Sequence, residues 1–126
     1  MNAELAELTA RVEIMESILG LRGKDPRQMD AILTAIAGVY QIQPQVITGP
    51  RRTAVAYRPR MIFCWMARRA GYSTHQIGKY LDRDHSAVVY ASAAMEDQLD
   101  TDPQFLAGIR SLAATLNIPL PERYSA

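Results

Sequence analysis

Apolar residues recur at intervals of three and four along most of the chain, and this period is typical of amphipathic helices. Together with proline and polar capping residues at their starts, these stripes predict helices over about residues 25–40, 58–70, 73–81, 84–99 and 103–116. Residues 41–47 are expected to form a turn with at most one short helical turn. No segment of useful length alternates apolar and polar residues as a strand would. The pattern therefore predicts an all-α helical bundle.

The first 21 residues carry an apolar stripe of their own. Its positions follow the 3-4-3-4 spacing of a heptad seam, at Leu5, Leu8, Val12, Met15 and Leu19. Fewer than three heptads make a weak coiled coil, because a short helix is marginal without packing. We expect this extra amino-terminal helix either to dock on its own domain or to pair with another copy or another protein. The predicted organisation is this element over 1–23, a main domain over 24–118 and a tail over 119–126.

Charge is unevenly distributed along a chain whose formal net charge is only +1. Between residues 51 and 83 eight residues are basic, and the single acidic residue is Asp82. The acidic residues gather near the start of the chain and after residue 95. A segment polarised in this way predicts a positive face of the kind that binds nucleic acid, with an ordinary solvated surface as the alternative.

The residue types that support other functions are scarce. The single cysteine, Cys64, excludes an internal disulfide framework and a multi-cysteine zinc site, and its apolar surroundings indicate a core thiol. His75 and His85 lie ten positions apart on different predicted helices and lack metal-ligand spacing. No phosphate-binding Gly-x-x-x-x-Gly-Lys-Ser/Thr motif occurs, and no apolar run approaches membrane length. We therefore expect no catalytic residues, metal, cofactor, bound nucleotide or membrane contact.

The most informative stretch of the chain is Arg83–Ala91. It places an acid, an imidazole and a small hydroxyl at the start of a predicted helix, directly after the tight polar turn 82–84. Asp84 suits the N-cap position, because its carboxylate can accept from the free amides of the first turn. A short helix, a tight turn and a second helix with polar residues at its amino end predict a helix-turn-helix.

Residues 40–116 resemble the carboxy-terminal DNA-binding domain (domain IV) of the bacterial replication initiator DnaA, a Trp-repressor-like helical bundle. Arg58-Pro59-Arg60-Met61 resembles the family's Arg-Pro-Arg-Gln-Met. Gln76-Ile77-Gly78 resembles its Glu-Ile-Gly. Arg83–Ala91 resembles its signature Arg-Asp-His-Thr-Thr-Val-Leu-His-Ala. The three matches occur in the family's order and with nearly its spacing.

The resemblance implies a set of DNA-contacting residues. Asp84, His85 and Ser86 fall on positions that read bases in the major groove, and Arg52 falls on a position that enters the minor groove. Ala87 replaces the second signature threonine, and its methyl could meet a thymine methyl. The implied phosphate contacts are Arg60 and Arg68, with Arg51, Lys79 and Arg83 as supplements.

The chain also departs from the family's pattern. Besides Ala87, Asp82 alone stands where the family has Gly-Gly, and the connection before Gln76 is one residue shorter. The ATPase domain has no counterpart here. We therefore expect a stand-alone, cytoplasmic, nucleoid-associated protein that is not an enzyme and binds double-stranded DNA at DnaA-box-like sites, regulating replication initiation or transcription. The alternative is an adaptor that keeps the fold but binds protein through its amino-terminal helix.

Overall fold

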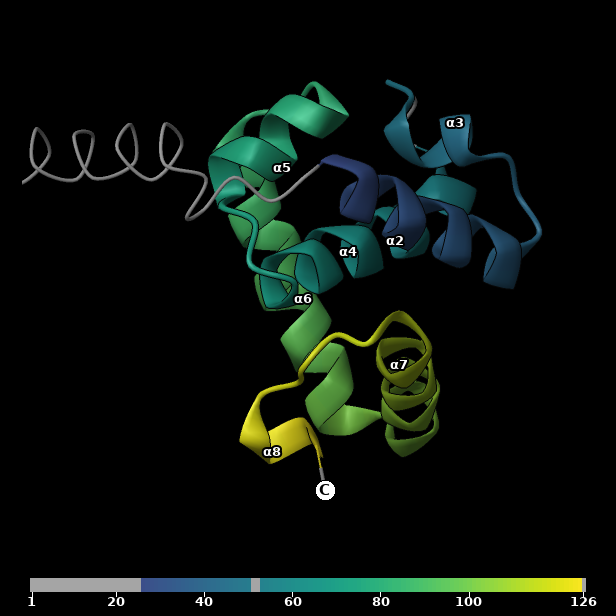
Figure 1. Cartoon of the computed structure of the whole chain (residues 1–126), viewed down its shortest axis with the longest axis vertical. Coiled ribbons are helices and arrows are strands. Elements are labelled where there is room, and N and C mark those ends of the chain that lie inside the picture. Colours follow the sequence, from purple (N-terminus) through teal and green to yellow (C-terminus); the bar gives the residue numbers. More distant parts are fainter. Residues whose placement is uncertain (1–25, 51–52, 126) are drawn as a thin grey trace, which may run out of the picture.

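The computed structural model describes residues 26–50 and 53–125 of the 126-residue chain. Within these ranges it contains seven helices and no strand, which confirms the all-α prediction (Figure 1). The helices are α2 (Pro26–Tyr40), α3 (Pro44–Thr48), α4 (Ala54–Arg69), α5 (Thr74–Leu81), α6 (His85–Thr101), α7 (Pro103–Leu116) and α8 (Glu122–Ser125). The amino-terminal element predicted over 1–23, and the candidates Arg51 and Arg52, lie outside the described residues.

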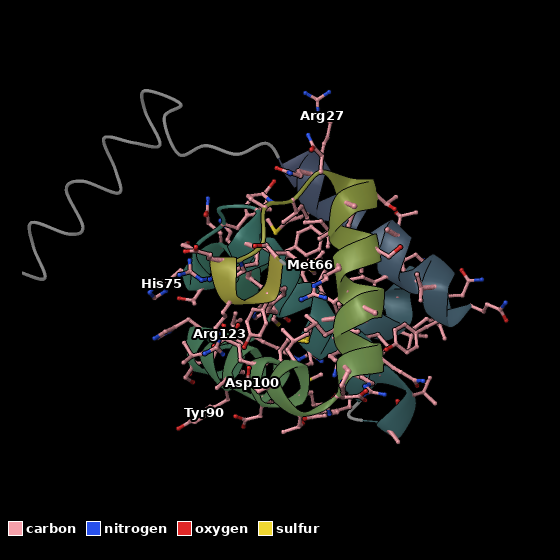
Figure 2. The ribbon with its side chains drawn as sticks, turned by 90° about the horizontal axis from the view of Figure 1, so that it is seen from below. Arg27, Met66, His75, Tyr90, Asp100 and Arg123 are labelled. Atoms are coloured by element: carbon pink, nitrogen blue, oxygen red, sulfur yellow. The ribbon has the colours of Figure 1, made fainter. Side chains whose placement is uncertain are left out.

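Helix α4 forms the centre of the bundle and packs against α2, α3, α5 and α6. Its segment Met61–Ala67 is buried on every side, as the all-round apolar composition of this segment predicts. Met66 accordingly lies in the interior in Figure 2. In the part of the chain that the structure describes, no helix is both long and apolar enough to cross a bilayer.

The start of α4 differs from the sequence prediction. The helix begins at Ala54 rather than near Arg58-Pro59, because Thr53 acts as its N-cap and accepts from the Ala56 amide at 3.3 Å. Pro59 therefore lies inside the helix instead of in its first turn. A proline at that depth leaves one carbonyl of the preceding turn without its helical amide partner. That carbonyl belongs to Val55, which is 60% exposed, so water can take the place of the missing amide.

The helix-turn-helix is formed by α5, the turn 82–84 and α6. Ser73 and Gln76 make a reciprocal capping box at the start of α5, and Asp82 ends this helix in the left-handed region with φ 55°. The turn is held close to α5 because the Arg83 amide donates to the Gly78 carbonyl at 2.8 Å. A Cβ at Gly78 would lie 2.6 Å from the Arg83 carbonyl oxygen, so a side chain there would push the turn away.

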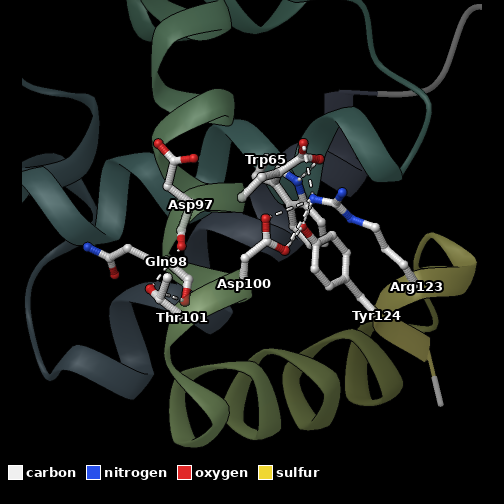
Figure 3. Close-up of polar contacts among 8 residues, drawn as sticks. Trp65, Asp97, Gln98, Asp100, Thr101, Arg123 and Tyr124 are labelled. Atoms are coloured by element: carbon white, nitrogen blue, oxygen red, sulfur yellow. Dashed lines mark hydrogen bonds and ion pairs between the residues drawn. The ribbon is translucent and has the colours of Figure 1, made fainter.

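The carboxy-terminal segment predicted as a tail contains α8, which packs on α7. Tyr124 is only 2% exposed, and its hydroxyl donates to Asp100 Oδ1 of α6 at 2.8 Å (Figure 3). Its ring lies edge-on to Trp65, with 6.0 Å between the ring centroids. Arg123 pairs with Asp100 at 3.2 Å and also donates to the Tyr124 hydroxyl. These contacts attach the end of the described chain to α4 and α6.

Candidate nucleic-acid interface

Four of the predicted base-reading residues lie together at the exposed amino end of α6. Asp84 is the N-cap, and its Oδ1 accepts from the Ser86 amide at 3.4 Å. The same oxygen lies 3.0 Å from His85 Nδ1, while the two side chains remain 71% and 50% exposed. Ser86 and Ala87 are also exposed. The first turn of α6 therefore presents an acid, an imidazole, a hydroxyl and a methyl group to the solvent side by side.

The backbone at the start of α6 also stabilises the ionised form of Asp84. The hydrogen bond from the Ser86 amide is the main cause that lowers the pKa of this carboxyl, and the nearby His85 lowers it further. Asp84 is a carboxylate at neutral pH, as an aspartate with its ordinary pKa would be, and both of its oxygens can accept hydrogen bonds. A hydrogen-bond acceptor at this position suits the amino group of cytosine in the major groove.

His75 joins this surface, although its sequence position gave it no role. Its ring stacks on that of His85, with 4.2 Å between the centroids and 30° between the planes. His75 projects from the margin of the molecule in Figure 2, as does Tyr90. Both histidines lie in the first turn of their helices, so the turn between α5 and α6 brings them together. In the sequence, only the positions of the two histidines at the starts of the two predicted helices of the helix-turn-helix could have indicated this contact.

Three of the predicted phosphate-binding arginines donate to backbone carbonyls of their own chain. Arg60 donates to three carbonyl oxygens at the end of α3, those of Val46, Ile47 and the C-cap Gly49, with the shortest bond, 2.8 Å, to Ile47. Arg83 binds the Gly49 carbonyl at 2.6 Å and the Leu81 carbonyl at 2.9 Å. Arg68 binds the Tyr72 carbonyl at 2.8 Å. These bonds hold the three guanidinium groups against the ends of helices α3, α4 and α5. Lys79, the remaining described candidate, is exposed on α5.

A groove of about 610 Å³ runs between the start of α4 and the first two turns of α6. Its walls include Asp84 and Ala87 from the start of α6, together with Tyr57 and Tyr90. These two tyrosines are 59% and 76% exposed. Sequence reasoning did not single them out, although Tyr90 stands where the DnaA signature has a histidine. The described residues form no cluster of three or more histidine, cysteine, aspartate or glutamate side chains suited to a metal ion.

Comparison with known proteins identifies the family. Residues 29–94, more than half of the chain, match the family model described as bacterial dnaA protein helix-turn-helix. The chain is 29% identical over 86 residues to the chromosomal replication initiator protein DnaA of Deinococcus radiodurans. The aligned region covers 68% of this chain and 18% of that protein. It is 28% identical to the protein of the same name from Thermomicrobium roseum, in an alignment of 133 positions that covers 95% of this chain and 29% of the relative.

A third relative carries the same name. The chromosomal replication initiator protein DnaA of Acinetobacter baylyi is 27% identical over 106 residues, which cover 82% of this chain and 23% of that protein. The chain thus spans less than a third of the length of these curated relatives. The resemblance carried by Arg58–Met61, Gln76–Gly78 and Arg83–Ala91 is confirmed, and the helix-turn-helix it implies indicates DNA binding. The chain belongs to the bacterial dnaA protein helix-turn-helix family.

Proposed function

We propose that this protein binds double-stranded DNA with sequence preference and recognises DnaA-box-like sites. The observation that carries the proposal is the exposed start of α6, where Asp84, His85, Ser86 and Ala87 lie side by side. We call these four residues the reading turn. The amino end of a recognition helix is the part that meets base edges when the helix enters the major groove. In this arrangement the chemistry of these four side chains determines which bases are accepted.

Each of the four groups has a distinct partner in the major groove. The Asp84 carboxylate accepts from the amino group of cytosine, and the Ala87 methyl contacts the methyl of thymine. His85 holds its Nδ1 close to Asp84 Oδ1, so its Nε2 is the ring nitrogen left for a base. The Ser86 hydroxyl can donate or accept, and therefore adapts to either kind of base edge.

The basic segment that contains Arg52 supplies the second part of the proposed interface. Arg52 follows Gly49 by three residues, and the Gly49 carbonyl is bound by both Arg60 and Arg83. These bonds attach the base of the segment to α4 and to the helix-turn-helix. We assign Arg52 to the minor groove, where a narrow groove concentrates negative potential. Arg51, Arg60, Arg68, Lys79 and Arg83 contact phosphates, which add affinity without sequence choice.

The names of the relatives suggest where such binding acts. They are chromosomal replication initiators, and this chain corresponds to less than a third of their length. We propose that the chain occupies DnaA-box-like sites and thereby competes with or assists an initiator, or regulates transcription at these sites. If the heptad stripe in residues 1–23 pairs two copies, two half-sites would be bound with avidity.

The test is a titration of a labelled duplex that carries a DnaA box against a shuffled duplex of the same composition. We expect the unmodified chain to prefer the box, and His85→Ala to reduce this preference by roughly 1–3 kcal/mol, about 5- to 150-fold. Ser111→Ala is the control, because this exposed residue lies on α7, away from α5 in Figure 1. Unchanged discrimination in the His85 variant would refute the assignment of the reading turn.

The same titration separates DNA binding from the adaptor alternative. An adaptor that keeps only the fold predicts no salt-dependent binding to any duplex. A DNA-binding domain that contacts phosphates predicts affinity that falls steeply as salt rises. The absence of binding by the folded chain to both duplexes at low salt would therefore favour the adaptor.

A further inference from the structure

We propose that His75 is a positioning residue that determines the sequence preference of this domain by fixing the ring of His85. The proposal rests on the assignment of His85 to base reading. It starts from the stacked pair of imidazoles, whose centroids lie 4.2 Å apart and whose planes differ by 30°. His75 comes from α5 and His85 from α6, so the stack bridges the two helices of the helix-turn-helix.

The reading ring needs such support because it stands in solvent. Half of the His85 side-chain surface is exposed, and an exposed imidazole at the first position of a helix can adopt several rotamers. Asp84 Oδ1 restrains one edge of the ring through Nδ1, at 3.0 Å. The face of the ring is restrained by His75. An edge contact and a face contact together determine both the plane of the ring and the direction of Nε2.

The backbone beneath His75 is well suited to hold a neighbour in place. The Ser73 amide donates to Gln76 Oε1 at 2.8 Å, and the Gln76 amide donates to Ser73 Oγ at 3.1 Å. His75 lies between these two residues in the first turn of α5, and the capping box satisfies the amides of Ser73 and Gln76. His75 therefore offers the His85 ring a surface whose backbone is fixed by its own hydrogen bonds.

Gly78 explains why the two rings meet. Residues three apart on a helix lie on the same face, so His75 and Gly78 share the face of α5 that approaches the start of α6. A Cβ at Gly78 would lie 3.3 Å from the His85 amide nitrogen and 2.6 Å from the Arg83 carbonyl oxygen. The helices approach this closely only with glycine at position 78, and the approach places His75 within stacking distance of His85.

Positioning has a defined consequence for binding. A reading residue that is ordered before binding loses less conformational entropy in the complex than one that must be immobilised there. This gain appears on the cognate duplex, where Nε2 meets its base, and not on a shuffled duplex. Removing the stack should therefore weaken discrimination while leaving non-specific affinity nearly unchanged.

The experiment compares His75→Ala, which removes the ring, with His75→Phe, which keeps a stacking face without ring nitrogens. Discrimination between the cognate and shuffled duplexes is measured for both variants, alone and combined with His85→Ala. Stacked aromatic pairs of this kind predict a loss of roughly 2- to 10-fold for His75→Ala and recovery of most of it in His75→Phe. In the His85→Ala background, His75→Ala should cause no further loss.

Different results would overturn different claims. Equal losses in His75→Ala and His75→Phe would show that a ring nitrogen of His75 contacts DNA directly, and an additive loss in the double variant would show that His75 acts without His85. If His85→Ala loses discrimination but His75→Ala does not, the positioning inference alone fails. If His85→Ala itself changes nothing, the reading assignment fails, and the inference with it.

A spectroscopic measurement separates positioning from a general structural effect. In the nuclear magnetic resonance spectrum of the free protein, the ring protons of His85 should shift in His75→Ala, because the ring current of a stacked neighbour is lost. The backbone amides of α6 beyond its first turn should keep their positions. Shifts spread along the whole of α6, together with a lower unfolding midpoint, would show that His75 only supports the fold and would overturn the proposal.

Discussion

Arg83, in the turn of the helix-turn-helix, donates through Nη2 to the carbonyl oxygen of Gly49 at 2.6 Å. Arg60 of α4 donates to the same oxygen at 3.1 Å. One carbonyl oxygen therefore joins the turn between α5 and α6, the central helix and the end of α3, directly before the basic segment that contains Arg52. This contact connects the two parts of the proposed DNA interface through the fold itself.

Loss of this contact should destabilise the domain as well as weaken DNA binding. We expect Arg83→Ala to lower the free energy of unfolding by roughly 1–2 kcal/mol, because two backbone carbonyls lose a charged donor at a partly buried position. Lys79→Ala removes an exposed positive charge on α5 and should change the free energy of unfolding by less than about 0.5 kcal/mol. Urea unfolding of both variants measures the difference, and equal stability would show that the Arg83 bonds contribute nothing.

Gly78→Ala should loosen the helix-turn-helix. The new methyl would lie 2.6 Å from the Arg83 carbonyl oxygen, so the turn must move, at a cost of roughly 1–3 kcal/mol in unfolding free energy. Gly108→Ala is the matched control, because a Cβ there meets no atom within 4 Å. That change within α7 should stabilise the protein by up to about 1 kcal/mol, since alanine favours the helix. Thermal unfolding that ranks the two variants in the opposite order would contradict this packing.

Cys64 should behave as a neutral core thiol. Burial raises its pKa to about 12, against an ordinary value of 9.0, despite the opposing influence of Arg60. The thiol of the unfolded chain therefore ionises first, and its contribution to stability, complete below pH 9, falls as pH rises from 9 towards 12. The expected slope is up to about 1.4 kcal/mol per pH unit.

Cys64→Ala removes this titration and serves as the comparison. Both proteins are unfolded with urea at a series of pH values between about 9 and 10.5, where the thiol of the unfolded chain ionises. Over this range the unfolding free energy of Cys64→Ala should fall less steeply than that of the unmodified chain. Rapid alkylation of the native thiol at neutral pH would contradict the buried position. The same reagent should modify the unfolded chain readily.

The hydroxyl of Tyr124 should stabilise the attachment of α8 to α6. Tyr124→Phe keeps the ring against Trp65 but removes the bond to Asp100, and we expect a loss of roughly 0.5–1.5 kcal/mol in unfolding free energy. Tyr57→Phe removes a hydroxyl from a side chain that is 59% exposed and should have almost no effect. A calorimetric comparison in which both variants match the unmodified protein would show that this bond is not stabilising.

Local chemistry explains why much of the fold can be predicted from the sequence. Asp84 and Asp102 cap the helices that follow them, and both starts occur where the sequence predicts them. The start of α4 was predicted wrongly, because Pro59 is a stronger local signal than the Thr53 cap, one polar residue within a basic loop. The predicted tail contains α8, whose attachment depends on Asp100 and Trp65, residues far away in the sequence.

The candidate site could be predicted only in part, for the same reason. Asp84–Ala87 are consecutive, so a single helix start brings them together. The stack of His75 on His85 depends on how closely α5 approaches α6. The bond from Arg83 to Gly49 joins residues 34 positions apart. Such contacts depend on tertiary packing, which residue spacing along one helix does not encode.

The most direct test of DNA recognition by the α6 reading turn is selection of bound duplexes from a random-sequence pool at moderate salt. We predict that the unmodified chain enriches one motif related to the DnaA box, and that His85→Ala recovers a pool in which this motif has lost definition at one or two positions. Recovery of unenriched duplexes by the folded, unmodified chain would contradict the account.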